Sequence, residues 1–439
     1  MKNLFKVYLK NVGEINWTIL GNILSFFGLI ILSSRLTFYL SPADYGKLSL
    51  LLTIQGLITQ MSFGAINNGV ARFYRIAIEK RDLNFFLIDC LLLFSKISLV
   101  IVLLSSPIFI YLEVKNSFWK NLFFLIVLFS IITGFNSIIS TIQSSARQRS
   151  IVAFHSILDP WLKIAFVFIT FLLFALDLEK LMIIYILVSV IILLSQIFFF
   201  LKCFKSNINE LRDMQLLRMT SWLKKIISFS LPIMVGGFFN WGFISSQRWA
   251  LNMFSSIENV GLFSVLSQFT YVPIVLVGGT FLSLITPIIY DKAGSMENLF
   301  KVKKTELLIY KISLFIFFST VFFSLISVFF GENILKYFVS EKYYSVSKYI
   351  PYMIFSAGLL QASSVISLVI SLNNKTFAFL YVSIVVNSIV IICNFLFTWL
   401  YGLSGLIFSL IFGSVLHLVV MYVLSKSNRF ETSPKLGTG

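Results

Sequence analysis

Residues 20–49 read LGNILSFFGLIILSSRLTFYLSPADYGKLS, and residues 235–264 read VGGFFNWGFISSQRWALNMFSSIENVGLFS. Aligned without a gap at an offset of 215 positions, the two stretches share a residue at five pairs of positions: Gly21 and Gly236, Leu36 and Leu251, Ser41 and Ser256, Gly46 and Gly261, and Ser49 and Ser264. Further on, Gly64 aligns with Gly279. Because the chain has only 22 glycines, these matches indicate an internal repeat, although two apolar helices can also resemble each other by chance.

The composition is that of a membrane protein. Apolar residues make up 58% of the 439 residues and charged residues only 12%, about half the charged fraction of a soluble domain. Long unbroken apolar runs can cross about 30 Å of hydrocarbon as helices. We therefore predict an all-α membrane protein of about twelve transmembrane helices, at residues 16–40, 47–68, 85–111, 119–143, 151–176, 181–203, 226–247, 260–289, 306–330, 348–372, 376–400 and 403–425.

The repeat predicts how these helices are grouped. Each half holds six helices, an even number, so each half begins and ends on the same side of the membrane and the halves are parallel repeats. We expect two six-helix lobes around a central cavity. The predicted parts are an N-terminal lobe, a cytoplasmic linker, a C-terminal lobe and a cytoplasmic tail, at residues 1–203, 204–225, 226–425 and 426–439.

Basic residues predict the orientation. Most of them lie on one side of the predicted spans, including Arg72, Arg75, Lys80, Arg81, Arg147, Arg149, Lys202, Lys205, Lys224, Lys225, Lys303 and Lys304. By the positive-inside rule, this side and both termini are cytoplasmic, in a multi-pass protein of the bacterial inner membrane. The same rule accounts for the net charge of +17, so we expect no nucleic-acid partner. No cleavage site precedes the first apolar run, and we expect that helix to be retained.

The motifs of ATP hydrolysis and of common hydrolases are absent from the sequence. It has no G-x-x-x-x-G-K-[ST] loop, no nucleophile elbow and no H-E-x-x-H. The two histidines, His155 and His417, are far apart, as are Cys90, Cys203 and Cys393. We therefore expect no metal, no cofactor and no enzymatic activity; a membrane-embedded polysaccharide enzyme is the least favoured alternative, because the predicted external loops are short.

Charged residues inside the predicted spans are the main candidates for function, because each is costly in hydrocarbon unless it faces water or a partner. The cations exceed the carboxylates, which favours a cavity that accepts an anion such as a phosphate-bearing lipid. The candidate substrate-binding cations are Arg35, Lys96, Lys163, Arg248 and Lys311, and the candidate ion-coupling carboxylates are Asp89 and Asp159. The alternative is that Asp159 and Lys163 pair at i,i+4 and that Arg35, Arg248 and Lys311 extend to the headgroups.

Helices 16–40 and 226–247 also carry polar residues on repeat-equivalent segments. Candidates for the cavity lining are Asn22, Ser25, Asn240 and Gln247. The same residues can instead serve as polar contacts between helices.

Several stretches resemble a known family. They are a short basic start with Trp17 opening a glycine-containing helix, LSPADYGKLSLLLTIQGL at 40–57, RFYRIAIEKRDLNFF at 72–86, and SLPIMVGGFFNWGFISSQRWALNMFSSIENVGLFSVLSQF at 230–269. Together they resemble the O-antigen and polysaccharide-biosynthesis flippases (the Wzx-like family) of the multidrug/oligosaccharidyl-lipid/polysaccharide exporter superfamily. The resemblance spans essentially the whole chain, and the turn that ends in Tyr45-Gly46 is its most specific part.

The resemblance implies two six-helix lobes and translocation of an undecaprenyl-pyrophosphate-linked oligosaccharide, an O-antigen or capsule repeat unit, from the cytoplasmic to the periplasmic leaflet. It also implies a cation-lined cavity, proton or sodium as possible coupling ions, and polymerase and export proteins as possible partners. Lipid II flippases of the superfamily usually carry two further helices, for which this chain is too short. Drug/cation antiporters of the superfamily match in length and are the alternative, but they usually depend on intramembrane carboxylates.

Overall fold

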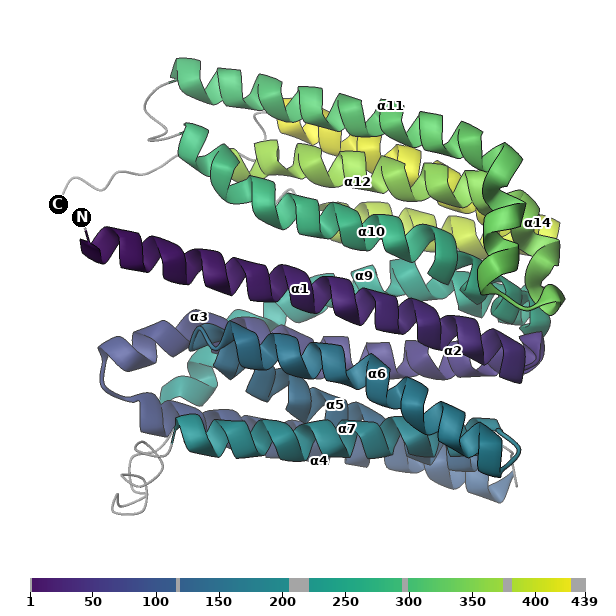
Figure 1. Ribbon diagram of the computed structural model, residues 1–439, viewed down its shortest axis with the longest axis horizontal. Helices are drawn as coiled ribbons and strands as arrows, with labels where there is room; N and C mark the ends of the chain where they lie inside the picture. Colours follow the sequence, from purple (N-terminus) through teal and green to yellow (C-terminus); the bar gives the residue numbers. More distant parts are fainter. Residues whose placement is uncertain (1, 116–118, 205–220, 294–298, 374–380, 428–439) are drawn as a thin grey trace. The chain divides into compact units, whose positions relative to one another are not determined.

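A computed structural model describes residues 2–115, 119–204, 221–293, 299–373 and 381–427 (Figure 1). Within these ranges every element is helical. The helices are α1 (Lys2–Tyr39), α2 (Pro42–Ile58), η1 (Thr59–Gly64), α3 (Ala65–Glu79), α4 (Leu83–Val114), α5 (Trp119–Ser145), α6 (Arg149–Leu173), α7 (Leu178–Cys203), α9 (Ser221–Phe254), α10 (Ile257–Ala293), α11 (Leu299–Phe338), η2 (Glu341–Tyr349), α12 (Ile350–Leu372), η3 (Val382–Val386) and α14 (Asn387–Lys426).

Eleven helices in the described part of the chain are long and apolar enough to cross a membrane. The last of them, Ile384–Lys426, covers the predicted span at 403–425 and, from residue 384 on, the predicted span at 376–400. Gly402 interrupts it with φ of 59° and ψ of −136°, a left-handed conformation that glycine adopts without steric cost. The predicted all-α membrane fold is confirmed.

Several helices are longer than the predicted spans, and two of these differences change the interpretation. The span predicted at 47–68 continues as one helix through α2, η1 and α3 to Glu79, so Arg72 and Arg75 lie on a helix and not in a loop. Within the predicted linker at 204–225, α9 already begins at Ser221. Residues 205–220 of that linker and 428–439 of the tail lie outside the described residues.

By their contacts, the residues form two compact units. Unit 1 comprises Met1–Leu40 and Leu50–Trp241, and unit 2 comprises Ser41–Ser49 and Gly242–Gly439. Two helices are divided between the units: the first turns of α2 belong to unit 2, and the first half of α9 belongs to unit 1. A division of helices between units was not predicted from the sequence.

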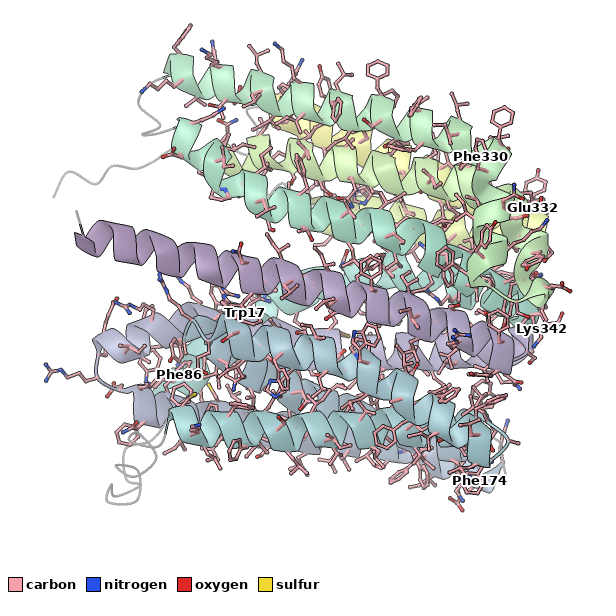
Figure 2. All side chains as sticks on the ribbon, in the orientation of Figure 1. Trp17, Phe86, Phe174, Phe330, Glu332 and Lys342 are labelled. Carbon is pink, nitrogen blue, oxygen red and sulfur yellow. The ribbon has the colours of Figure 1, made fainter. Side chains whose placement is uncertain are left out.

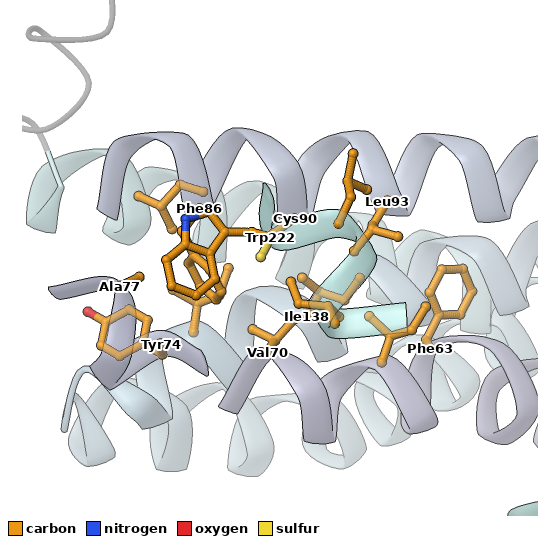
Figure 3. Close-up of a cluster of buried hydrophobic side chains, with 14 of the residues drawn as sticks. Phe63, Val70, Tyr74, Ala77, Phe86, Cys90, Leu93, Ile138 and Trp222 are labelled. Carbon is orange, nitrogen blue, oxygen red and sulfur yellow. The ribbon is translucent and has the colours of Figure 1, made fainter. Parts of the chain in front are cut away.

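The core of unit 1 joins α9 to the N-terminal helices (Figure 3). Trp222 at the start of α9 is buried and meets Phe86 of α4 edge to face, with ring centroids 5.7 Å apart. Tyr74 of α3 and Ile138 of α5 belong to the same cluster. Because aromatic pairs of this geometry add to the stabilisation from apolar burial, they hold the first turn of α9 against α3, α4 and α5.

Large apolar side chains also cover much of the outside of both units (Figure 2). Phe174 of unit 1 and Phe330 of unit 2 are exposed by 62% and 58% of their surface. A water-soluble protein seldom exposes so many large apolar groups, whereas hydrocarbon solvates them well. This surface is the one expected of a multi-pass membrane protein.

The 215-residue offset is visible in the ends of the helices. α1 ends at Tyr39 and α9 at Phe254, and α2 begins at Pro42 and α10 at Ile257. The helix starts are also capped alike: the Ser41 hydroxyl accepts the Asp44 N–H at 3.1 Å, and the Ser256 hydroxyl accepts the Asn259 N–H at 3.2 Å.

Candidate functional site

The starts of α2 and α10 cross closely within unit 2. A methyl group added at Gly46 would overlap the carbonyl oxygen of Ile257, and one added at Gly261 would overlap the carbonyl oxygen of Pro42. The two clashes are related by the repeat, because Pro42 is equivalent to Ile257 as Gly46 is to Gly261. Reciprocal contacts of this kind are the mark of a two-fold axis passing between the two segments.

One turn further along, a buried polar contact joins the same two helices to α9. Ser49 of α2 and Ser264 of α10 share a hydrogen bond of 2.6 Å between their hydroxyl oxygens. The Arg248 Nε on α9 donates to the Ser264 hydroxyl at 3.2 Å. Among the described residues Arg248 forms no ion pair with a carboxylate. The sequence therefore led to Arg248, but not to the two serines that fix its side chain.

Aromatic rings accompany this site. Tyr45 lies close enough to Arg248 to interact with it electrostatically. Its ring meets that of Tyr343 edge to face, with centroids 6.0 Å apart, and both tyrosines are buried. We call Arg248, Ser264, Ser49 and Tyr45 the arginine site. It combines a partly buried guanidinium, a pair of hydroxyl groups and an apolar wall, which is chemistry suited to an oxyanion.

Lys163, in unit 1, already has an anionic partner. Its ammonium lies 2.7 Å from the Asp159 carboxylate, as the i,i+4 alternative predicted, and 4.9 Å from the ring centroid of Tyr185. A second ring, that of Phe129, lies 5.7 Å away. Asp159 and Lys163 therefore neutralise each other here, and their roles in ion coupling and in substrate binding remain predictions.

Asp89 of α4 is buried at the first turn of α9. Its carboxylate accepts the backbone N–H of Leu223 at 3.3 Å and also interacts with that of Trp222. A carboxylate at a helix N-terminus satisfies unpaired N–H groups and favours the helix dipole. The structure thus gives Asp89 a structural contact that the sequence did not reveal, and its role in ion coupling stays a prediction.

The other three candidate cations have solvent- or lipid-exposed side chains. Arg35 on α1 and Lys96 on α4 belong to unit 1, and Lys311 on α11 belongs to unit 2. In the described part of the chain none of the three forms an ion pair. Arg35 and Lys96 lie on other helices than Lys163, the paired cation of unit 1. Lys311 lies on another helix than the residues of the arginine site in unit 2.

The four polar candidates fall into two groups. Asn22 and Asn240 are exposed, as a cavity lining requires. Ser25 donates to the Ser156 carbonyl at 2.6 Å and so joins α1 to α6, and Gln247 is buried and donates to its own helix at Phe243, 3.4 Å away. The contacts of Ser25 and Gln247 are packing contacts within the protein, as the alternative to a cavity lining predicted.

Unit 2 also has a buried polar network that the sequence analysis missed. Asn394 donates to the Ser246 hydroxyl at 2.9 Å and accepts from Ser409 at 2.7 Å. His417 Nε2 and the Asn387 side-chain oxygen are 2.9 Å apart. The available signal was the spacing of Asn387 and Asn394, which places two amides on one face of a helix. No cluster of metal-ligating side chains occurs among the described residues.

Solved structures share this fold. An inward-facing multidrug resistance MATE family transporter of the MOP superfamily superposes with a TM-score of 0.64 at 15% identity, over 94% of this chain and 96% of that one. The lipid II flippase MurJ in an inward closed conformation gives a TM-score of 0.64 at 14% identity, over 95% of this chain and 88% of that one. The MATE multidrug transporter DinF-BH, solved as a complex, gives a TM-score of 0.61 at 17% identity, over 95% of both chains.

No protein-family model and no curated protein sequence matches the chain. At identities of 14–17% the similarity is one of fold. The chain therefore has the fold of the MATE transporters and of MurJ.

Proposed function

We propose that the protein is a flippase that moves an undecaprenyl-pyrophosphate-linked oligosaccharide, an O-antigen or capsule repeat unit, from the cytoplasmic to the periplasmic leaflet of the bacterial inner membrane. The observation that carries the proposal is Arg248, a partly buried cation with no acidic partner among the described residues. The fold shared with MurJ, whose name describes a lipid II flippase, is consistent with it. In this proposal the protein acts by alternating access and has no enzymatic activity.

The argument from Arg248 is energetic. A cation within a membrane span costs several kcal/mol unless an anion or water compensates it. The Arg248 Nε donates to Ser264, and no hydrogen bond from the terminal nitrogens of the guanidinium to another described residue is seen, so these nitrogens can bind a ligand. A guanidinium recognises phosphate through two parallel hydrogen bonds, and a pyrophosphate offers several suitable oxygen atoms. An anionic lipid-linked substrate therefore suits this residue better than a cation does.

The remaining predictions complete the proposal. Two lobes, at 1–203 and 226–425, would move relative to each other around a cavity lined by Arg35, Lys96, Lys163 and Lys311 as well as Arg248. Both termini would be cytoplasmic. The isoprenoid tail would stay in lipid throughout, so that the protein needs to carry only the polar head across.

A drug/cation antiporter is the second candidate, and the fold shared with the MATE transporters supports it equally. That activity usually needs an intramembrane carboxylate free to exchange ions. Here Asp159 is paired with Lys163, and Asp89 is bound to backbone N–H groups of α9. These contacts favour the flippase.

Complementation separates the two candidates. The gene is expressed in bacterial strains that lack their O-antigen flippase and differ in repeat unit, and surface polysaccharide and resistance to cationic drugs are scored together. We expect polysaccharide to be restored in at least one strain without a gain in resistance. Resistance without polysaccharide would instead support the antiporter.

The arginine site is tested in the complemented strain. Arg248→Ala should abolish polysaccharide export at normal membrane levels of the protein, and Arg248→Lys should restore part of it. The matched control is Arg75→Ala, because Arg75 is exposed on α3 and pairs with Glu79 at 3.2 Å. Normal export by Arg248→Ala would remove the observation on which the proposal rests.

A further inference from the structure

An apolar groove opens on the surface of unit 2 between α11, α12 and α14. Its volume is about 450 Å³, and its walls are formed chiefly by Leu314, Phe317, Ala362, Ile366, Leu418 and Val419. Ligand sites in proteins commonly have volumes of about 300–1,000 Å³. The groove is therefore large enough for part of a small ligand or of a hydrocarbon chain.

The surface around the groove is one that faces hydrocarbon. Leu314 and Val419 in its walls are exposed by 54% and 52% of their surface. Leu307, Phe318 and Phe322 lie on the same face of α11 as Leu314 and are exposed by 60%, 61% and 59%. Because water is a poor solvent for such a surface, a lipid chain is the natural occupant of the groove.

A cation lies at one end of the groove. Tyr310 and Tyr422 line that end, and the Tyr310 hydroxyl is 2.8 Å from that of Ser425. The Lys426 ammonium lies 4.5 Å from the ring centroid of Tyr422 and 6.0 Å from that of Tyr310. Within the described ranges Lys426 pairs with no carboxylate. The groove thus leads from an apolar floor to hydroxyl groups and a lysine that lacks an acidic partner.

We propose that this groove binds one acyl chain of an anionic phospholipid, with the lipid phosphate against Lys426 and the hydroxyl groups of Tyr310 and Ser425. Charge complementarity selects the occupant, since a zwitterionic lipid fills the groove equally well but offers no net charge to the lysine. α12 ends at Leu372 and α14 at Lys426, on the side predicted to be cytoplasmic. Basic pockets between helices on that side commonly bind anionic headgroups.

The test compares nanodiscs of phosphatidylcholine with nanodiscs that also contain phosphatidylglycerol, using the full chain. The readouts are the thermal unfolding temperature and the number of phosphatidylglycerol molecules retained in native mass spectrometry. We expect phosphatidylglycerol to raise the unfolding temperature of the wild type. Lys426→Gln should lower the affinity for phosphatidylglycerol about fivefold. This corresponds to about 1 kcal/mol, the contribution of one lysine near the membrane surface.

Two further variants make the result specific. Val419→Trp fills the groove without changing charge and should likewise reduce the phosphatidylglycerol effect. Lys202→Gln is the control, because Lys202 is an exposed lysine in the last turn of α7 and is not one of the residues that line the groove. An equal effect of phosphatidylglycerol on the wild type, Lys426→Gln and Val419→Trp would overturn the proposal.

A third arm tests the other lipid that carries phosphate. Polyisoprenyl diphosphate is added to phosphatidylcholine nanodiscs at the same molar ratio. Stabilisation of the wild type by this lipid but not by phosphatidylglycerol would assign the groove to a substrate tail and overturn the phospholipid assignment. Arg248→Ala should keep the phosphatidylglycerol effect, so this inference stands apart from the proposed flippase activity.

Discussion

Ser49 and Ser264, 215 positions apart in the sequence, hydrogen-bond to each other through their hydroxyl groups at 2.6 Å. They are also the residues that the repeat makes equivalent. Two equivalent residues contact each other only if they lie at the axis that relates the repeats. The contact therefore supports the internal repeat independently of the sequence match and places the local two-fold axis between the first turns of α2 and α10.

This contact predicts a cross-link. In a variant with Cys90, Cys203 and Cys393 replaced by serine, Ser49→Cys and Ser264→Cys together should form a disulfide on mild oxidation. Hydroxyl oxygens at hydrogen-bond distance put the two Cβ atoms within the range that a disulfide spans, about 3.5–4.5 Å. The check is loss of maleimide labelling that returns on reduction. Each single cysteine variant is the control, and continued labelling of the oxidised pair would contradict the contact.

The glycine crossing predicts equal effects at equivalent positions. Gly46→Ala and Gly261→Ala should each lower the free energy of unfolding by about 1–3 kcal/mol, because the added methyl group meets a backbone carbonyl that cannot easily move. The thermal unfolding temperature in detergent measures the change. Gly279→Ala is the control, since its added methyl group would meet no atom within 4 Å beyond the adjacent backbone of its own helix, and we expect it to be neutral.

The Asp159–Lys163 pair predicts a rescue by double substitution. Asp159→Asn leaves the Lys163 ammonium without its counter-charge and should destabilise the protein by about 1–3 kcal/mol, less than a fully buried pair because Asp159 is 32% exposed. Lys163→Met in the same chain should restore most of the loss. Thermal unfolding of the wild type, of each single variant and of the double variant gives the coupling energy between Asp159 and Lys163. Purely additive effects would show that the pair contributes nothing.

Ion coupling through Asp159 has a separate readout. If Asp159 carries a coupling ion, Asp159→Asn abolishes any proton or sodium dependence of transport. The double variant shares that loss even though its stability is restored. Unchanged ion dependence in both variants would leave Asp159 as a structural partner of Lys163.

Asp89 predicts a graded effect on α9. Asp89→Ala removes the acceptor for the Leu223 N–H and should cost about 0.5–2 kcal/mol, whereas Asp89→Asn keeps an acceptor oxygen and should cost less. Protection of the first turn of α9 in hydrogen exchange reports the change directly. Asp82→Asn serves as the control, because Asp82 makes no capping side-chain hydrogen bond to α4. Equal hydrogen-exchange protection of this turn in all variants would contradict the proposal that Asp89 caps α9.

The fold class followed from apolar runs alone, because a bilayer leaves only helices and closed barrels for a spanning chain. The i,i+4 pairing of Asp159 and Lys163 was likewise readable, since both residues lie on one helix. The ends of the helices were harder to predict. The predicted span 47–68 stops with the apolar stretch, whereas the helix continues to Glu79 through the amphipathic α3.

The sequence by itself determined the membrane class, the repeat offset of 215 and the residues that carry charge within the spans. Only the tertiary structure decided that Asp89 meets the start of α9, that Arg248 meets Ser264, and that Asn394 meets Ser246. Each of these contacts joins residues on two different helices. The physical reason is that helices in lipid are apolar on nearly every face, so hydrophobic periodicity does not mark the face that meets a neighbour, and helix packing decides which polar groups become partners.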